Sequence, residues 1–68
     1  MRKQFQYTIV ADAYSTGGTV TASTHESAFS KIRREVTGDS LIDRGDDIVV
    51  TLYDLEDEVI GIQEYTKD

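Results

Sequence analysis

The chain of 68 residues contains no cysteine and no proline, and its longest apolar run is only three residues, Ile48–Val50. Without cysteine the protein has no disulfide, no thiolate nucleophile and no thiolate-bound metal. A secreted domain of this size usually carries a disulfide, so we expect a cytoplasmic protein. So short an apolar run excludes a membrane-spanning helix. Polar residues follow the basic N-terminal start directly, so we also expect no targeting peptide.

The length and the charge distribution limit the functions open to the chain. Residues 1–68 are enough for one small domain and leave little room for both a core and a catalytic cleft. Residues 1–34 have a net charge of +3 and residues 35–68 a net charge of −9, which together make −6. Phosphate neutralisation needs a basic surface, so this total argues against direct nucleic-acid binding.

Alternation of apolar and polar residues predicts two strands in the first third of the chain. From Gln4 to Ala13 nearly every second residue is apolar, as in a strand with one buried face. The segment Ser15–Gly18 ends in two glycines, which tolerate the positive φ of a tight turn, so we place a hairpin turn there. A segment rich in β-branched residues, 19–23, predicts the second strand.

A single amphipathic helix is predicted over residues 24–37. Ser23 followed by Glu26 fits a capping box, with Ser23 as N-cap. Gly38 is expected to end the helix in the left-handed conformation. The apolar residues that recur at helical spacing, and that we expect to face the sheet, are Ala28, Phe29, Ile32 and Val36.

The last third of the chain predicts a second hairpin. Alternation over 47–55 indicates a strand, Glu56 and Asp57 indicate the turn, and residues 59–65 indicate the returning strand. Gly61 is expected to mark a bulge or a close approach within that strand. The predicted order is ββαββ, an α+β domain in which one helix packs on one face of a mostly antiparallel four-stranded sheet.

The connection over residues 38–47 is polar and acidic. Leu41 and Ile42 within it are expected to form a turn under the edge of the core. Carboxylate clusters can bind Ca²⁺, but the EF-hand spacing is absent, so we favour a solvated loop and expect no metal. The tripeptide Arg44-Gly45-Asp46 is interpreted as a turn, not as an adhesion motif. The acidic residues of this connection are Asp39, Asp43, Asp46 and Asp47.

No constellation typical of catalysis is present. His25 is the only histidine, no glycine-flanked serine accompanies it, and we expect it to be exposed in the first helical turn. Gly17 and Gly18 join two strands and do not precede a helix, so a hairpin tip is favoured over a phosphate loop. The helix also carries a cluster of cations, Lys31, Arg33 and Arg34. Cations in the C-terminal half of a helix interact favourably with its dipole, and they can also contact an acidic partner.

One helix leaves the second face of the sheet uncovered. We expect Val10, Tyr14, Val49 and Tyr53 on that face, and a domain this small would gain stability from a protein partner or a homodimer that covers it. Acidic residues surround the second turn and, together with residues 39–47, they predict an acidic rim. Such rims usually serve solubility, but they can also imitate the phosphates of DNA.

The layout of three segments resembles a known group of small proteins. Residues 2–10 lead into a hairpin, residues 20–29 contain Thr-Ala-Ser-Thr-His-Glu-Ser-Ala at the start of the helix, and residues 48–53 form a late strand. This arrangement looks like the small ββαβ proteins of bacteriophages and related mobile elements, such as the T7-type inhibitor of bacterial RNA polymerase. The resemblance is one of layout, so it carries over no functional residue. It implies a protein that binds and blocks a host enzyme or defence system.

These observations predict a non-enzymatic binding protein of the host cytoplasm that docks on a host or phage protein and inhibits or modulates it, in one form as an acidic DNA mimic. Two alternatives stay open: a homo-oligomeric assembly protein, or an enzyme or small-molecule binder whose pocket forms between chains. No cofactor is expected. The residues predicted to contact the partner are Tyr14, Asp43, Asp46, Asp47, Tyr53, Asp54, Glu56, Asp57, Glu58 and Tyr65.

Overall fold

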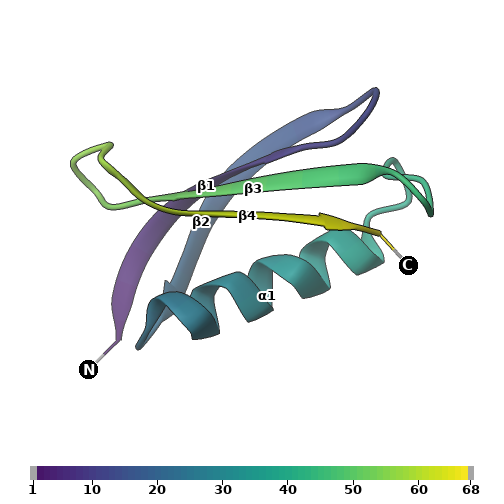
Figure 1. Cartoon of the computed structure of the whole chain (residues 1–68). Helices are drawn as coiled ribbons and strands as arrows, with labels where there is room; N and C mark the ends of the chain where they lie inside the picture. The colour runs from purple at the N-terminus through teal and green to yellow at the C-terminus, as the bar shows by residue number, and fades with distance from the viewer. Residues whose placement is uncertain (1, 68) are drawn as a thin grey trace.

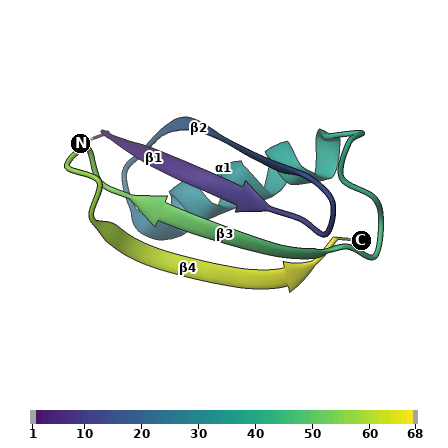
Figure 2. The same ribbon diagram turned by 90° about the horizontal axis from the view of Figure 1, so that it is seen from above.

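A computed structural model describes residues 2–67 and contains four strands and one helix. The strands form one antiparallel sheet in the order β2-β1-β3-β4, and α1 lies across one of its faces (Figures 1 and 2). The predicted α+β fold with the order ββαββ is therefore confirmed. Within the described part of the chain, no helix has the length and apolar character needed to cross a bilayer. The elements are β1 (Lys3–Val10), β2 (Ser15–Ala22), α1 (His25–Gly38), β3 (Asp47–Tyr53) and β4 (Val59–Thr66).

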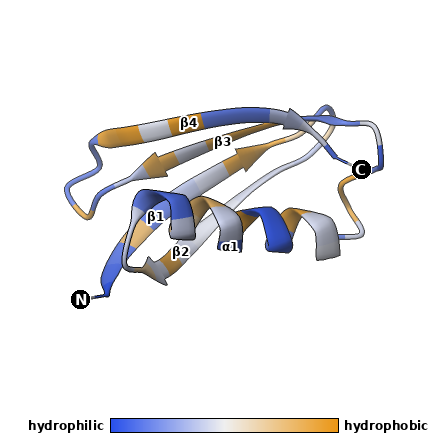
Figure 3. Ribbon diagram, turned by 60° about the horizontal axis from the view of Figure 1, so that its bottom comes forward, coloured by the Kyte–Doolittle hydropathy of each residue, from blue (hydrophilic) through white to orange (hydrophobic). Residues whose placement is uncertain are grey.

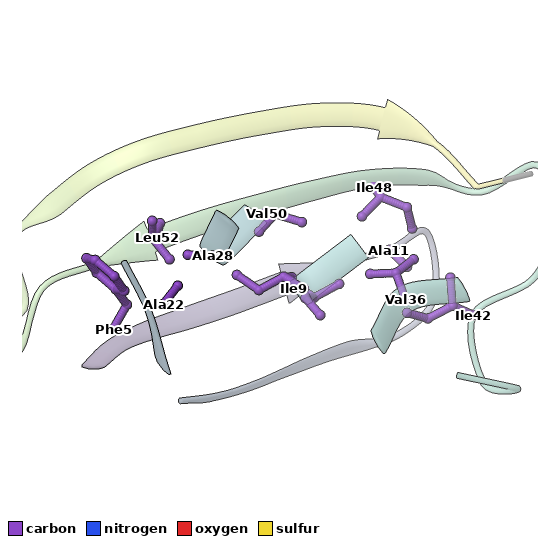
Figure 4. Close-up of a cluster of buried hydrophobic side chains, with 11 residues drawn as sticks. Phe5, Ile9, Ala11, Ala22, Ala28, Val36, Ile42, Ile48, Val50 and Leu52 are labelled. Carbon is purple, nitrogen blue, oxygen red and sulfur yellow. The ribbon is translucent and has the colours of Figure 1, made fainter. Parts of the chain in front are cut away.

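The core lies between α1 and the sheet and uses every second residue of β1 and β3. Phe5 and Ile9 of β1 alternate with polar residues, and Ile9 lies opposite Val50 of β3. The predicted helical stripe is confirmed, since Ile32 has 0% of its surface exposed. The buried cluster comprises Phe5, Ile9, Ala11, Ala22, Ala28, Ile32, Val36, Ile42, Ile48, Val50 and Leu52 (Figure 4).

The first hairpin turns earlier than predicted. Its turn spans residues 11–14, where the amide of Ala11 donates to the carbonyl of Tyr14 at 2.7 Å, and the two glycines lie inside β2. Gly18 lies opposite Tyr7, and a Cβ on Gly18 would lie 3.1 Å from the Tyr7 hydroxyl oxygen. A Cβ on Gly17 would lie 2.7 Å from the Tyr7 carbonyl oxygen. The glycines therefore make room for Tyr7 across the strand pair and do not form the turn.

Both predicted ends of the helix need correction. The N-cap is Thr24, whose hydroxyl accepts from the Ser27 amide at 3.1 Å, so the helix begins one residue later and the Ser23–Glu26 capping box does not form. Gly38 is the last helical residue, yet Gly45 is the only glycine with positive φ among residues 2–67. The helix ends because Asp39 adopts extended backbone, not through a left-handed glycine.

The connection between α1 and β3 closes one end of the core. Ile42 is buried as predicted, with 2% of its surface exposed, whereas Leu41 is 65% exposed. Gly45 has φ of 92°, which confirms the interpretation of Arg44-Gly45-Asp46 as a turn. Of the two adjacent apolar residues, only Ile42 therefore enters the core, and Leu41 points to solvent.

Lys67 fastens this connection to the end of β4. Its Nζ donates to the carbonyl of Asp39 at 2.8 Å and also to the carbonyl of Ile42, and only 8% of the residue is exposed. The amide of Gly45 donates to the carbonyl of Lys67 at 2.8 Å, and the Lys67 amide donates to Asp46 at 3.0 Å. A buried ammonium needs such acceptors, so the site is satisfied by main-chain oxygens.

The second hairpin follows the prediction closely. β3 ends at Tyr53, two residues before the predicted end, and its register with β4 shifts between Leu52 and Tyr53. Gly61 lies opposite Leu52, and a Cβ there would lie 3.0 Å from the ring of Phe29 on the helix. The expectation of a close approach at Gly61 is therefore confirmed, and the strand irregularity lies next to it.

Candidate protein-binding surface

The face of the sheet opposite α1, here called the open face, carries an exposed apolar strip. The register brings Val10 opposite Val49, and it brings Tyr53 opposite Val59. Ile62 lies opposite Thr51 in the row between them. The exposed fractions are 49% for Val10, 55% for Val59 and 60% for Ile62. The apolar strip comprises Val10, Val49, Tyr53, Val59 and Ile62, and Figure 3 shows the apolar first half of β4.

The acidic turn, residues Asp54–Glu58, adjoins one end of this strip. The Asp54 carboxylate accepts from the amides of Glu56 at 2.8 Å and Glu58 at 3.0 Å, and the Asp54 amide donates to the Glu58 carbonyl at 3.0 Å. Asp57 has φ of 65°, in the left-handed region that aspartate tolerates. Asp54 thus organises the turn internally, whereas Glu56, Asp57 and Glu58 are exposed. Leu55 is 59% exposed at the same turn.

A shallow hollow lies where the acidic turn meets the strip. Its lining includes Tyr53 and Asp57 together with Gln6, Thr8 and Thr19 from the neighbouring strands. Asp57 is the only acidic or basic side chain in this lining, so the hollow has no pair of groups for acid–base catalysis. A mostly uncharged hollow beside a tyrosine is suited to receiving a side chain of another protein.

Charge is divided between the two faces of the molecule. On the open face the strands carry the carboxylates of Asp47 and Glu64 and no lysine or arginine, because Lys3 of β1 lies opposite the buried Ala22 on the helix-covered side. The cationic side chains Lys31, Arg33 and Arg34 lie on α1. The sequence-level contrast between a basic first half and an acidic second half therefore becomes a contrast between the helical layer and the open face.

The predicted single acidic rim does not form. β3 runs from one end of the sheet to the other, so the connection before it and the acidic turn after it lie at opposite ends of a molecule 34 Å long (Figure 1). Asp43 and Asp46 lie at the far end, where the Asp43 amide donates to the Asp46 carboxylate at 3.2 Å. Asp47 accepts from the Thr66 hydroxyl at 3.4 Å. These predicted contact residues are therefore separated from Glu56, Asp57 and Glu58.

Only one of the three predicted tyrosine anchors lies on the open face. Tyr65 lies opposite Ile48 on the helix-covered side, with the Arg33 guanidinium 4.0 Å from the centre of its ring. Its hydroxyl is buried and has no hydrogen-bond partner among residues 2–67. Burial raises the pKa of Tyr65, and the charge of Arg33 opposes that rise. Tyr14 packs against the core at the first hairpin turn, so it does not lie on the open face either, and Tyr53 is the one predicted anchor on that face.

His25 lies at the start of α1, beside β1. His25 is exposed and meets Phe5 edge-on, with ring centroids 5.6 Å apart and an interplanar angle of 87°. Among residues 2–67, no group of three or more histidine, aspartate and glutamate side chains is gathered where it can hold a metal ion. The contact shown for the His25 ring is therefore packing against Phe5 of β1.

Sequence reasoning missed the contribution of β4 to the surface. Val59 and Ile62 are in the apolar strip, and Leu55 is exposed beside it, but none of them was predicted to contact a partner. The register shift near Gly61 interrupts the period of two, so the faces of β4 cannot be assigned by alternation alone. The signal that assigns Ile62 is its distance from Tyr65. Tyr65 lies opposite Ile48 and faces the helix, so Ile62, three residues earlier in the strand, faces the other way.

The ββαββ order of this chain has one strand more than the ββαβ order of the small phage proteins. The similarity is therefore limited to the arrangement of elements. Comparison with protein-family models, with curated proteins and with solved structures finds no match, so no family is assigned to this chain.

Proposed function

We propose that this protein is a non-enzymatic binding protein that docks on a larger protein through the apolar strip and the acidic turn and modulates its activity. The observation that carries the proposal is the exposed strip around Tyr53 on a face where no strand position is lysine or arginine. Exposed apolar side chains gathered on one face are typical of interaction surfaces, and tyrosine is enriched among the residues that dominate binding energy.

The chemistry of the open face supports a partner with an apolar centre and a basic border. Apolar side chains on the partner would cover Tyr53 and Ile62, and lysine or arginine at its border would meet Glu56 and Glu58. Charges at the rim of an interface act mainly on the rate of association, and salt screens them. Association is therefore expected to slow as salt rises, while the apolar contact is retained.

A narrower form of the proposal makes the partner a nucleic-acid-binding protein of the host, inhibited because acidic residues occupy its phosphate site. The acidic turn would enter that site by itself, since the connection that carries Asp43 and Asp46 lies at the other end of the sheet. In this form duplex DNA competes with the protein for its partner. If the partner binds equally well in the presence of excess duplex DNA, the protein does not act as a DNA mimic. The proposed docking surface is not contradicted by that result.

The test is affinity capture from bacterial lysate followed by measurement of the purified pair. Tyr53→Ser is expected to weaken binding roughly 30-fold, as loss of a central tyrosine anchor does. Ile62→Thr removes part of the strip, and Leu41→Thr is its matched control, because Leu41 is 65% exposed at the other end of the molecule. Binding that Tyr53→Ser leaves intact, or that Leu41→Thr weakens as much as Ile62→Thr, contradicts the proposal.

A further inference from the structure

The two edge strands of the sheet differ in how they resist pairing with another strand. β4 carries Glu64 and a shifted register, and the acidic turn precedes it. β2, with the sequence STGGTVTA, contains no charged residue and no proline, and its register with β1 is continuous. Charges, proline and bulges are the usual devices that keep an edge strand from pairing, and β2 has none of them.

Most of the outward side of β2 is available for main-chain hydrogen bonds. An edge strand uses about half of its amides and carbonyls in the sheet, and the others point outward. Among residues 2–67 one side chain bonds to the main chain of β2, the Lys31 Nζ to the carbonyl of Thr21 near the strand's end. The segment Ser15–Val20 is therefore without a side-chain cap, and it is long enough for a ladder of several residues.

A groove runs between β2 and the flank of α1. Its lining includes Val20 and Tyr7 on the sheet side, and Lys31, Arg34 and Glu35 on the helix side. The helix flank therefore presents both signs of charge. A two-fold axis brings the same flank of a second copy against the first. Glu35 of one copy can then lie near Lys31 or Arg34 of the other, so the surface is self-complementary.

We propose that β2 pairs antiparallel with β2 of a second copy of this chain, which joins the two four-stranded sheets into one continuous sheet. A two-fold axis perpendicular to the sheet near Thr19 keeps both helices on the same side. It pairs Gly17 with Thr21 of the second copy, so in the dimer the Thr21 carbonyl exchanges the Lys31 ammonium for a main-chain amide. The occupant is a second copy because its strand is already formed and loses little conformational freedom on docking. Pairing of uncharged β2 strands opposes no like charges, and threonine pairs across strands are favourable.

This interface goes beyond the proposed function, because it uses the β2 edge and leaves the apolar strip uncovered. The test is sedimentation at about 150 mM salt, where charges more than about 8 Å apart are screened. The expected mass rises with concentration from 7.6 kDa to twice that value. Thr19→Lys adds a charge beside the two-fold axis on both copies and is expected to raise the dissociation constant roughly tenfold.

Gln63→Lys is the matched control, since it adds the same charge to an exposed position on the other edge strand and is expected to leave the dissociation constant unchanged. Amide hydrogen exchange of the wild type supplies a test that needs no variant: protection of β2 amides should increase with concentration, and protection of β4 amides should not. A chain that stays monomeric at all concentrations, or a dimer that Gln63→Lys weakens as much as Thr19→Lys, overturns the proposal. Either result leaves the Tyr53→Ser experiment unaffected.

Discussion

The two faces of the sheet are built from alternate residues of the same strands, yet one face is buried under the helix and the other is open to solvent. In β3, Ile48, Val50 and Leu52 are buried under α1, whereas Val49, Thr51 and Tyr53 face outward. The covered face provides stability through a closed apolar core. The open face is half apolar, carries Asp47 and Glu64 but no lysine or arginine at its strand positions, and is not covered by α1. One helix thus divides a single sheet into a covered surface that forms the core and an open surface that we propose for recognition.

The largest expected effect is the difference in stability between shortening an apolar side chain on the covered face and shortening one on the open face. Leu52→Ala on the covered face removes a fully buried side chain and should cost about 3 kcal/mol of the free energy of unfolding, which leaves a domain this small largely unfolded. Ile62→Ala on the open face should change it by no more than about 0.5 kcal/mol. Urea unfolding measures both, and similar losses would contradict the division between the faces.

A second test addresses how the covered face is closed at its end. Lys67→Met leaves the carbonyls of Asp39 and Ile42 without their charged donor and should cost about 2 kcal/mol. Lys31→Met is the control, because its Nζ donates to one carbonyl, at the edge strand, and should cost less than about 1 kcal/mol. Thermal unfolding of the two variants gives the comparison, and an equal loss would remove the special role of Lys67.

The buried hydroxyl of Tyr65 is a defect of the covered face that can be removed. Tyr65→Phe keeps the ring beside Arg33 and deletes an oxygen that has no hydrogen-bond partner in the described part of the chain, so stability at neutral pH should rise by up to about 1 kcal/mol. Thermal unfolding at about pH 7 measures the gain. A loss of stability would show that the hydroxyl has a partner in solution.

Tyr65→Phe should also change the response of stability to alkali. In the wild type the pKa of Tyr65 is raised above 10.0 in the folded state, so the unfolded chain loses its proton first and stability falls as pH rises through this region. The pKa of Tyr7 is raised as well, by burial and then by Glu35, so the variant keeps part of the effect. Unfolding between about pH 8 and about pH 11 should show a shallower loss in the variant.

The smallest expected effect concerns the helix that makes the faces different. Gly38→Ala places a Cβ in open space at the last helical position and should stabilise the protein by about 0.5–1 kcal/mol. Gly61→Ala is the contrast, because its Cβ would lie 3.0 Å from the Phe29 ring and should destabilise. Binding through the open face should be unchanged in Gly38→Ala, and a change would link the two faces.

Sequence patterns predicted the elements of this fold well and their ends less well. The period of two assigned β3 correctly because its pairing with β1 is continuous from Val49 to Tyr53. The helical stripe around Ile32 followed likewise from residue spacing. The first hairpin turn was wrong because Gly17 and Gly18 are needed for the approach of Tyr7, a contact between strands that local turn preferences do not contain. The N-cap was wrong by one residue because Ser23 and Thr24 are both good caps.

The candidate site was predicted only in part. Tyr53 and the acidic turn were identified because aromatic and charged residues are visible in any sequence. Val59 and Ile62 were missed because the register shift in β4 hides which face they occupy. Tyr14 and Tyr65 were assigned to the partner surface, but one packs on the core and the other lies under Arg33.

The sequence by itself determined the order of elements, the buried stripe of the helix and the net charge, because these depend on residue spacing and composition. Only the tertiary structure decided which charges lie together. A strand carries the chain from one end of the sheet to the other, so two acidic segments separated by β3 end far apart, although they are close in sequence. The same antiparallel pairing brings Val10, Tyr53 and Ile62 onto one face, because register and not sequence distance sets neighbours in a sheet.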